Sequence, residues 1–156
     1  MDCIRTIEGS ATEEELDDWL FGHRTARLYF GGRPRHARVG DLMFIAFHGR
    51  MVAVGTVANM DDEPREDGFY WITLRAVRAI PGDNPAYRGY ASIKYVDRLA
   101  AQFGGRYAKL AKRLVRIAQD YRSEGGPRDT AGSKRTRTAT RPSPRGRRAA
   151  PARATR

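Results

Sequence analysis

The apolar residues that can build a protein core stop abruptly at Tyr121. Residues 122–156 contain no aromatic residue and no Leu, Ile, Val or Met, and Gly, Pro, Ser, Thr, Ala and Arg dominate them. Such a segment cannot bury enough apolar surface to offset the conformational entropy that folding removes. The sequence therefore predicts one globular domain over residues 1–121 and a disordered, arginine-rich basic tail over residues 122–156.

The positive charge is concentrated in this tail. The chain of 156 residues carries 29 Lys and Arg against 18 Asp and Glu, a formal net charge of +11. Eleven basic and two acidic residues lie in 122–156, which gives the tail +9 and leaves +2 for residues 1–121. Because clustered positive charge binds polyanions and releases their counterions, we expect nucleic acid, RNA or DNA, as the partner. The tail residues expected to contact phosphates are Lys134, Arg135, Arg137, Arg145, Arg147 and Arg148.

Cysteine usage and hydropathy exclude several classes of protein. Cys3 is the only cysteine, so one chain can form neither an internal disulfide nor a multi-cysteine zinc site. Residues 1–8 lack the apolar run of a signal peptide, and no stretch approaches the roughly twenty apolar residues of a membrane span. The expectation is a soluble, cytoplasmic protein with no membrane partner.

Capping signals and hydrophobic spacing predict two helices. Two overlapping capping boxes within residues 10–15 predict a helix over residues 12–20, which Gly22 can end. Its apolar residues fall at helical spacing: Leu16, Trp19 and Leu20. Residues 106–121 carry an apolar stripe at helical spacing. Its opposite side is basic, with Arg106, Lys109, Lys112, Arg113 and Arg116. This side is either a phosphate-binding face or an ordinary solvated face.

Strand signals occupy most of the remaining chain. Residues 42–48 and 51–58 are two apolar, β-prone runs separated by Gly49-Arg50, which predicts a hairpin with a type II′ turn. Further strands are predicted over residues 25–30, 69–80 and 93–96. The fold class is therefore mixed α+β, with a β-rich domain flanked by helices.

The hairpin and the segments after it resemble a known group of domains. Residues 38–48 read Arg-Val-Gly-Asp-Leu-Met-Phe-Ile-Ala-Phe-His, and the returning strand carries Val-Gly-Thr-Val at 54–57. This pattern is similar to the central hairpin of PUA-like barrels, the group that contains the EVE, ASCH and YTH domains. The strand over 69–80, Tyr87-Arg-Gly-Tyr90 and Lys94-Tyr-Val96 are similar to later parts of EVE-like members. The resemblance covers roughly residues 16–98.

This resemblance implies a small, partly open β-barrel with flanking helices that binds RNA or DNA. Some relatives hold a modified or flipped base in an aromatic-lined pocket, which requires stacking surfaces and a few hydrogen-bond donors. For each aromatic residue, a packing role in the core is the competing interpretation. By position, the candidate base-binding residues are Trp19, Arg24, His48, Tyr70, Trp71, Arg88, Tyr90, Lys94 and Tyr95.

Catalytic signals are weak. Some ASCH-type proteins are hydrolases that use a lysine, and this chain offers only Arg24-Thr25 near the corresponding loop. Arginine does not lose its proton as a catalytic base must. The three histidines, His23, His36 and His48, lack metal-ligand spacing, and Gly31-Gly32 lacks the context of a nucleotide fingerprint.

The sequence therefore predicts a non-enzymatic nucleic-acid-binding protein with no catalytic residue, metal or cofactor. Two alternatives stay open. One is an architectural, nucleoid-type DNA-binding protein that acts through its tail alone, and the other is an ASCH-like hydrolase of a modified nucleoside.

Overall fold

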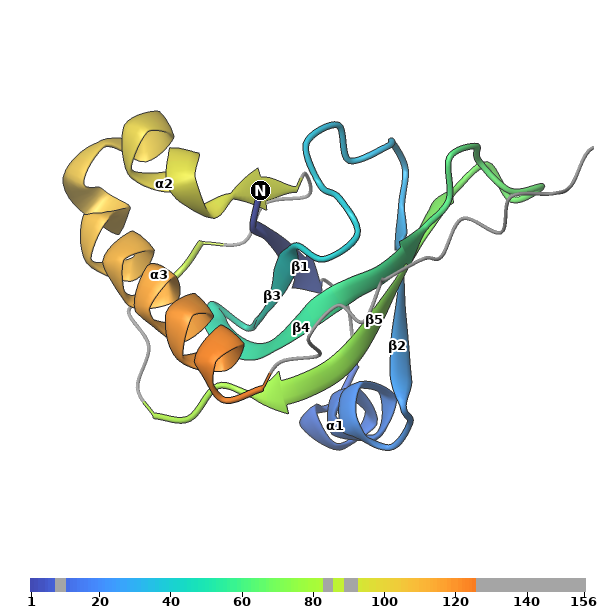
Figure 1. The fold of residues 1–156 in the computed structure, drawn as a ribbon, viewed down its shortest axis with the longest axis horizontal. Helices are drawn as coiled ribbons and strands as arrows, with labels where there is room; N and C mark the ends of the chain where they lie inside the picture. The colour runs from blue at the N-terminus through green and yellow to red at the C-terminus, as the bar shows by residue number, and fades with distance from the viewer. Residues whose placement is uncertain (8–10, 83–85, 89–92, 126–156) are drawn as a thin grey trace, which may run out of the picture.

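Six strands form one mixed sheet that curls into a half-barrel (Figure 1). The computed structural model describes residues 1–7, 11–82, 86–88 and 93–125. The strands are β1 (Cys3–Ile7), β2 (Thr25–Phe30), β3 (Leu42–Phe47), β4 (Arg50–Met60), β5 (Tyr70–Ala79) and β6 (Lys94–Tyr95). The helices are α1 (Glu13–Phe21), α2 (Val96–Phe103) and α3 (Ala108–Ser123), with a 3-10 turn (Gly104–Tyr107) before α3. The strand order is β2-β5-β4-β3-β1-β6, with β1 and β3 parallel and the other pairs antiparallel.

Strand β3 separates two hydrophobic clusters. All six of its residues are buried, and successive side chains point to opposite faces of the sheet. Met43 and Ile45 pack in the cluster inside the half-barrel, whereas Phe44 packs in the cluster under α2 and α3. Because both faces are covered, the strand is continuously apolar rather than alternating.

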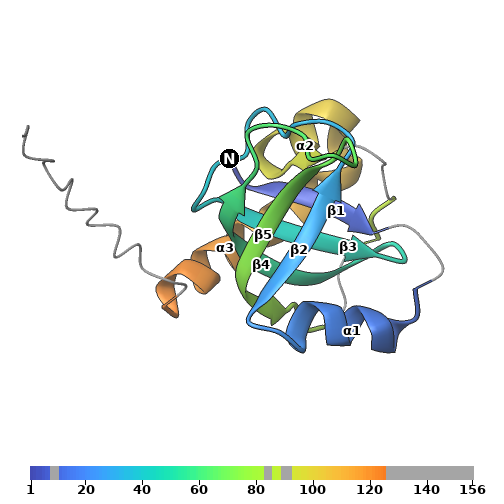
Figure 2. The same cartoon turned by 90° about the vertical axis from the view of Figure 1, so that its right-hand side faces the viewer.

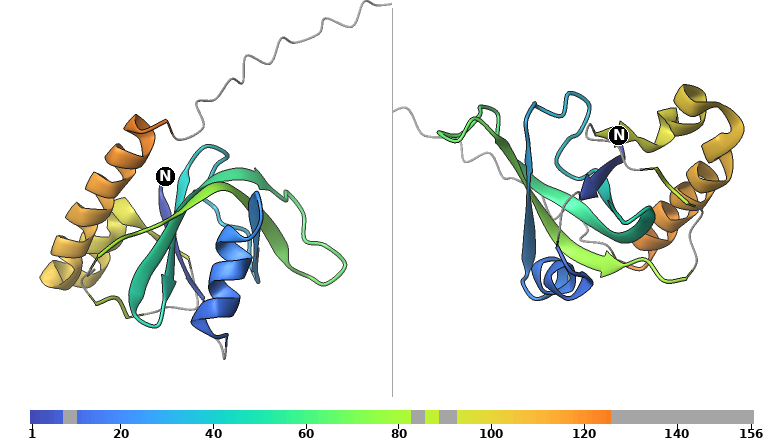
Figure 3. Two further views of the ribbon diagram at one scale, coloured as in Figure 1. Left: turned by 90° about the horizontal axis from the view of Figure 1, so that it is seen from below. Right: turned by 180° about the vertical axis from the view of Figure 1, so that it is seen from behind.

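The helices cover the two faces of this central strand. Leu16 and Leu20 of α1 join the cluster inside the half-barrel. Leu99 of α2 and Leu114 of α3 join the cluster on the other face. Figures 1 and 3 show α2 and α3 together on one side of the strands and α1 on the other. Each fully buried leucine of this kind stabilises the fold by about 1.5–3 kcal/mol.

Helix α1 confirms the predicted capping box. The Thr12 hydroxyl accepts a hydrogen bond from the Glu15 backbone N–H at 3.2 Å, and the Glu15 carboxylate accepts the Thr12 N–H at 2.8 Å. Gly22 is the C-cap in right-handed conformation, and a Cβ there would lie 2.4 Å from the Asp18 carbonyl oxygen. The helix thus ends at a residue whose lack of a side chain lets the chain turn closely against the last helical turn.

The β3–β4 hairpin is confirmed, but its predicted turn is wrong. The turn residues are His48 and Gly49, and Phe47 pairs with Arg50. Both turn residues have positive φ, at 44° and 77°. Two positive φ values define a type I′ turn, which matches the twist of the flanking strands. The prediction placed the turn one residue later because a Gly-X pair is also a type II′ signal.

Several boundaries differ from the predicted ones. Strand β1 and helix α2 had no counterpart in the predicted elements, and the last strand shortens to the two residues of β6. The predicted domain boundary at Tyr121 falls inside α3, which continues to Ser123. The strand predictions over 25–30 and 69–80 correspond to β2 and β5. The arginine-rich segment after residue 125 lies outside the described residues.

Tyr121 anchors α3 to the sheet, and its hydroxyl gives a stability prediction. The hydroxyl donates to the Ala76 carbonyl at 2.6 Å and lies 3.2 Å from the Thr56 hydroxyl. Removing it leaves buried groups without a partner, so we expect Tyr121→Phe to lower the free energy of unfolding by about 1–2 kcal/mol. Tyr29→Phe, on the exposed face of β2, should change it by less than about 0.5 kcal/mol. Urea denaturation of both variants tests this; equal losses would contradict an anchoring role.

Candidate nucleic-acid interface

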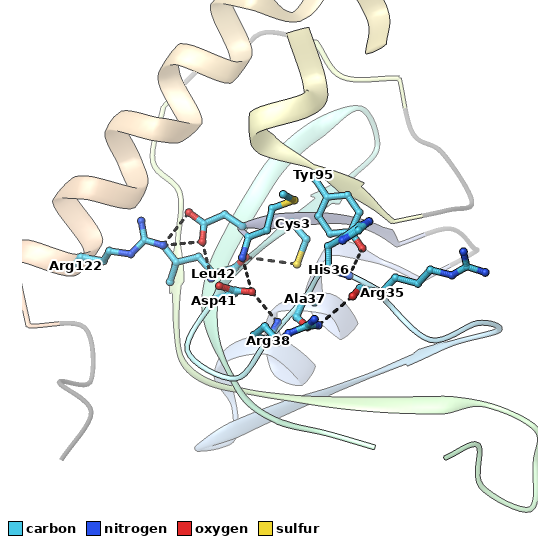
Figure 4. Close-up of polar contacts among 11 residues, drawn as sticks. Cys3, Arg35, His36, Ala37, Arg38, Asp41, Leu42, Tyr95 and Arg122 are labelled. Atoms are coloured by element: carbon cyan, nitrogen blue, oxygen red, sulfur yellow. Dashed lines mark hydrogen bonds and ion pairs between the residues drawn. The ribbon is translucent and has the colours of Figure 1, made fainter. Parts of the chain in front are cut away.

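The segment from Gly31 to Asp41 links β2 to β3 and is held in a fixed shape by local hydrogen bonds (Figure 4). The His36 backbone N–H donates to the Tyr95 hydroxyl at 3.2 Å. The Arg38 guanidinium donates to the Arg35 carbonyl at 3.0 Å and to the Ala37 carbonyl at 2.8 Å. The Arg35 and Ala37 carbonyls are thus occupied by hydrogen bonds within the segment. The Arg35 side chain extends outward, away from these hydrogen bonds (Figure 4).

The N-terminus ties this segment to α3. The Met1 ammonium group lies 2.6 Å from the Asp41 carboxylate. Asp2 accepts the Leu42 backbone N–H at 3.0 Å and the Arg122 guanidinium at 2.6 Å (Figure 4). Charge-assisted hydrogen bonds of this kind are stronger than neutral ones, so they fix the first residues against β3 and the end of α3.

A basic pocket of about 590 Å³ opens beside this segment. Its cationic lining residues are Arg5, Arg33, Arg35, Lys94 and Arg98. Its other lining residues are Phe30, Gly31, Gly32, His36, Ile93 and Tyr95. No described residue of the lining is acidic, although Arg33 forms an ion pair with Asp62 outside the lining, so positive charge predominates in the pocket. When the residues that line a cleft carry charge of one sign, the cleft focuses their electrostatic field. A positively charged lining therefore attracts anions.

Ring systems form part of the same pocket. The Arg5 guanidinium carbon lies 4.7 Å from the centroid of the Phe30 ring. His36 and Tyr95 meet edge to face, with their centroids 5.2 Å apart. A site with rings and guanidinium groups can contact both a base and its phosphate.

Four elements supply the pocket. Strand β2 delivers Phe30 as its last residue, because Gly31-Gly32 and Pro34 cannot continue a paired strand. Arg5 comes from β1, and β6 contributes the two residues Lys94 and Tyr95. Helix α2 adds Arg98 from its exposed side. The site is therefore assembled from segments more than ninety positions apart in the chain.

A second hollow, the α3 groove, has a volume of about 740 Å³. Its floor is apolar, and its rim carries Arg78, Lys112, Arg113 and Arg116 together with Asp120 and Glu124. Arg78 pairs with Glu124 at 3.2 Å, and the Arg113 guanidinium donates to the Pro81 carbonyl at 3.3 Å. Asp120 and Glu124 therefore neutralise part of the positive charge that the four basic residues bring to this groove.

The predicted basic face of α3 is divided by this groove. Lys112, Arg113 and Arg116 line it, and Arg106 and Lys109 do not. Arg106 instead lies over the Tyr107 ring, with its guanidinium carbon 5.6 Å from the centroid. A ligand seated in the α3 groove would therefore contact only part of the predicted face.

The structure does not bring the nine candidate base-binding residues into one pocket. Among the candidates that the structure describes, only Lys94 and Tyr95 line the basic pocket. Trp19 is half-buried and packs against the cluster inside the half-barrel, and Arg24 is exposed after α1. His48 lies at the hairpin turn, where its ring stacks on Phe47 at 3.9 Å between centroids. It shares a separate hollow with Glu13 and Asp17.

Tyr70 and Trp71 lie at the start of β5, and Trp71 belongs to an exposed group. Its ring centroid lies 5.7 Å from that of Tyr29, which in turn lies 5.3 Å from that of Phe69. We call Tyr29, Phe69 and Trp71 the aromatic trio. The Trp71 indole N–H donates to Asp67 at 3.2 Å. Trp71 is therefore on the outer face of the sheet, apart from the basic pocket.

The remaining candidates are exposed or outside the described residues. Arg88 is exposed, and its backbone N–H donates to the Tyr107 hydroxyl at 3.1 Å. Tyr90 and the six tail positions Lys134, Arg135, Arg137, Arg145, Arg147 and Arg148 lie outside the described residues.

Sequence reasoning missed most of the basic pocket. The sequence assigned no role in a pocket to Arg5, Phe30, Arg33, Arg35, His36 or Arg98. One signal was available: residues 33–38 read Arg-Pro-Arg-His-Ala-Arg, a cationic cluster in an otherwise nearly neutral domain.

Other site chemistries were tested against the described residues. No group of three or more His, Cys, Asp or Glu side chains there is arranged to hold a metal ion. Across the same residues, no helix combines the length and apolarity needed to cross a membrane. At the half-buried Asp61, the hydrogen bond from Arg65 is the main cause that lowers the carboxyl pKa below its ordinary value.

Comparisons with protein-family models, with curated proteins and with solved structures found no match to this chain. The PUA-like resemblance therefore stays a prediction. The function is inferred below from the charges, rings and hydrogen bonds of the sites themselves.

Proposed function

We propose that this protein binds nucleic acid without catalysis, and that the basic pocket receives phosphate and base groups of the ligand. The observation that carries the proposal is the pocket lining, which has five cations and no acidic side chain among the described residues. A nucleic acid strand offers regularly spaced phosphates to such cations and releases counterions when they bind.

The rings of the pocket favour a nucleic acid over a simple anion. Phe30, His36 and Tyr95 lie among the cations. His36 is exposed and can contact a base by its face or edge, whereas Phe30 and Tyr95 are buried and form the apolar base of the pocket. Arg35, free to extend outward, can bind phosphate oxygens in a bidentate manner. Phosphate contacts position a strand and carry no sequence information, so base preference would come from His36 and from Lys94.

We also propose that the half-barrel is PUA-like. In support, the Gly40-Asp41 pair performs the role that the resemblance implies, since it turns the chain into buried strand β3. Gly40 has a φ of 94°, its N–H donates to the Val57 carbonyl at 2.9 Å, and Val57 donates back to Asp41 at 2.9 Å. Gly55 lies so close to its neighbours that a Cβ would meet Val77 at 3.0 Å. These contacts explain why the two short motifs require glycine.

A non-catalytic role is part of the proposal. Arg24 and Thr25, the residues nearest to the expected position of an ASCH-type site, are both exposed. The strongly basic guanidinium cannot act as a general base there. The basic pocket likewise offers binding groups, with no lining carboxylate among the described residues to accept a proton.

The test removes two cations from the basic pocket. The double variant Lys94→Ala/Arg98→Ala of the full chain should bind single-stranded RNA, single-stranded DNA or duplex DNA at least roughly tenfold more weakly at 100 mM salt, a loss of about 1.4 kcal/mol. Charge-assisted contacts of about 1.5–3 kcal/mol each make this a lower bound. Fluorescence anisotropy with all three ligands measures the effect.

Arg50→Ala is the matched control, because Arg50 is an exposed cation on the hairpin, in the hollow shared by Glu13 and Asp17. Its affinity should stay within about twofold, in line with a surface charge that contacts no ligand. If the pocket variant and the control bind all three ligands as the unaltered protein does, the basic pocket is not the interface.

A further inference from the structure

The aromatic trio forms an exposed apolar surface on the outer face of β2 and β5. Tyr29 is 53% exposed and Phe69 is 38% exposed. Tyr29 and Trp71 are directly paired across the two strands. Figure 2 shows β2 and β5 in front of the other elements, with no helix of the described chain over them. Large aromatic residues gathered at an exposed position indicate an interaction surface.

An acidic loop borders this surface. Residues 61–67 connect β4 to β5 and contain five carboxylates and one arginine, a net charge of −4 in a protein of net +11. Asp67 accepts the indole N–H of Trp71 at 3.2 Å, so the loop and the trio are in direct contact.

Arg65 shows how a guanidinium is held at this place. It donates to the Asp61 carboxylate at 2.6 Å, and its guanidinium carbon lies 5.6 Å from the centroid of the Trp71 ring. The same group therefore has a carboxylate partner and an aromatic partner. Arginine is suited to both because its flat guanidinium stacks on rings and forks onto carboxylates.

We propose that the aromatic trio and the acidic loop dock the arginine-rich segment of this same chain, residues 126–156. That segment contains nine arginines and one lysine against a single acid, Asp129. Its arginines would repeat on Tyr29 and Phe69 the paired contact that Arg65 makes with Trp71 and Asp61. Opposite net charges on the loop and the segment favour the encounter.

The segment is long enough to reach the trio from the end of α3. It begins three residues after Ser123, and 31 residues can span up to roughly 100 Å when extended. A domain of this size has a radius of gyration of only about 14 Å. Tethering also gives the segment a high effective concentration at the surface, of the order of millimolar.

Helix α1 is the competing acidic surface. Residues 13–18 contain five carboxylates, and Phe21, 39% exposed, is the large aromatic residue exposed on that helix. The two surfaces thus have the same number of acids and differ in their rings. Residues 13–18 contain no basic residue and carry −5, whereas the acidic loop carries −4 and its Asp62 is paired with Arg33. Charge alone would therefore favour α1, whereas stacking on rings selects the trio.

Docking has a consequence that rests on the proposed function. An arginine engaged with the trio cannot contact a phosphate at the same time, so nucleic acid and the trio compete for the segment. The docking itself does not require that proposal to be right, and its test contains no nucleic acid.

The experiment places a photo-crosslinking amino acid on the surface of the full chain. Tyr29 or, in a second variant, Phe69 is replaced by p-benzoylphenylalanine; matched variants carry it at Phe21 on α1 and at Val115, 46% exposed on α3. After irradiation at 50 mM salt, mass spectrometry locates the crosslinks. We expect crosslinks from 29 and 69 to residues 126–156, at least roughly fivefold above those from 21 and 115.

Two further arms test the physical basis. Crosslinking from position 29 should disappear at 1 M salt, where the Debye length falls to about 3 Å. It should also fall severalfold in Glu63→Gln/Glu66→Gln, which removes two exposed charges of the acidic loop without touching the hydrogen bonds of Asp61 or Asp67.

Three results would overturn the proposal. The first is crosslinking from position 21 that equals or exceeds the crosslinking from 29 and 69, which would mean docking by charge alone. The second is the absence of crosslinks to residues 126–156 from both 29 and 69. The third, read from a mixture of isotope-labelled and unlabelled chains, is crosslinking only between chains, which would make a second copy the occupant. Each can occur while the basic-pocket variants still behave as proposed, so the two proposals fail separately.

Discussion

A chain that ends at residue 125 will lose most of the salt dependence of its nucleic-acid binding. The deletion removes ten of the 29 basic residues and one acid. Each phosphate that a protein neutralises on duplex DNA contributes about 0.9 to the slope of log affinity against log salt, so the slope should fall by up to about 9. Between 50 and 200 mM salt, six or more such contacts change affinity by roughly 10³-fold or more.

Residue 125 is the correct end point because the folded domain does not stop at Tyr121. Helix α3 continues to Ser123, and Arg122 pairs with Asp2 beside β3. A chain cut at 121 would lose that ion pair, and an effect on folding would be mistaken for an effect on binding. Circular dichroism and thermal unfolding of the 1–125 chain are therefore measured alongside its affinity.

The deletion also separates two binding mechanisms. If the basic pocket is an interface, the 1–125 chain keeps measurable affinity that Lys94→Ala/Arg98→Ala removes. If the protein is an architectural one that acts through its arginine-rich segment alone, the 1–125 chain loses all affinity. An unchanged salt slope would remove residues 126–156 from the interface; it would contradict the architectural mechanism and leave the basic pocket as the binding site.

Local signals predicted the elements that local chemistry determines. The capping box at Thr12, the strand over residues 25–30 and the two apolar runs of the β3–β4 hairpin each lie within fewer than twenty consecutive residues. Strand β1 was missed because its five residues gain their stability from parallel pairing with β3, some forty positions away. Such pairing leaves little trace in a short sequence window.

The site was less predictable than the fold for the same reason. Lys94 and Tyr95 were found because they follow a recognisable pattern, whereas Arg5 and Arg98 enter the pocket from elements whose positions were unknown. Trp71 lies in a strand, as the sequence predicted. Strand periodicity alone, however, does not show which face of the sheet is exposed to solvent. The exposure of Tyr29 shows that this is the outer face, because the Trp71 ring lies beside the Tyr29 ring on the same side of the sheet.

Raising the pH above 9 will destabilise the protein through Cys3. The pKa of this thiol is raised from its ordinary 9.0 to about 12, chiefly by burial and also by the carboxylates of Asp41 and Asp2, while the N-terminal ammonium group opposes them. Its side chain is fully buried in β1, with Sγ 3.6 Å from the Leu42 carbonyl oxygen (Figure 4). The folded state thus holds the neutral thiol, and the unfolded state releases its proton three pH units earlier.

The direction of the effect follows from proton linkage. Below pH 9 both states carry the proton and Cys3 contributes its full stabilisation. Between pH 9 and 12 only the unfolded state ionises, so the free energy of unfolding falls by about 1.4 kcal/mol for each pH unit. At pH 11 the loss reaches about 2.5 kcal/mol, which is a large part of the stability of a domain of this size.

Cys3→Ala isolates this contribution, because the variant keeps every lysine and tyrosine that also titrates above pH 9. Urea denaturation at pH 8 and pH 11 should show the unaltered protein losing about 2.5 kcal/mol more than the variant. At pH 8 the variant is the less stable of the two, because the substitution leaves a small cavity against β3. As the pH rises, the difference in the free energy of unfolding between the two proteins should shrink to zero or change sign. Equal losses in the two proteins would mean that the thiol ionises as readily in the folded state, which would contradict its enclosure between β1 and β3.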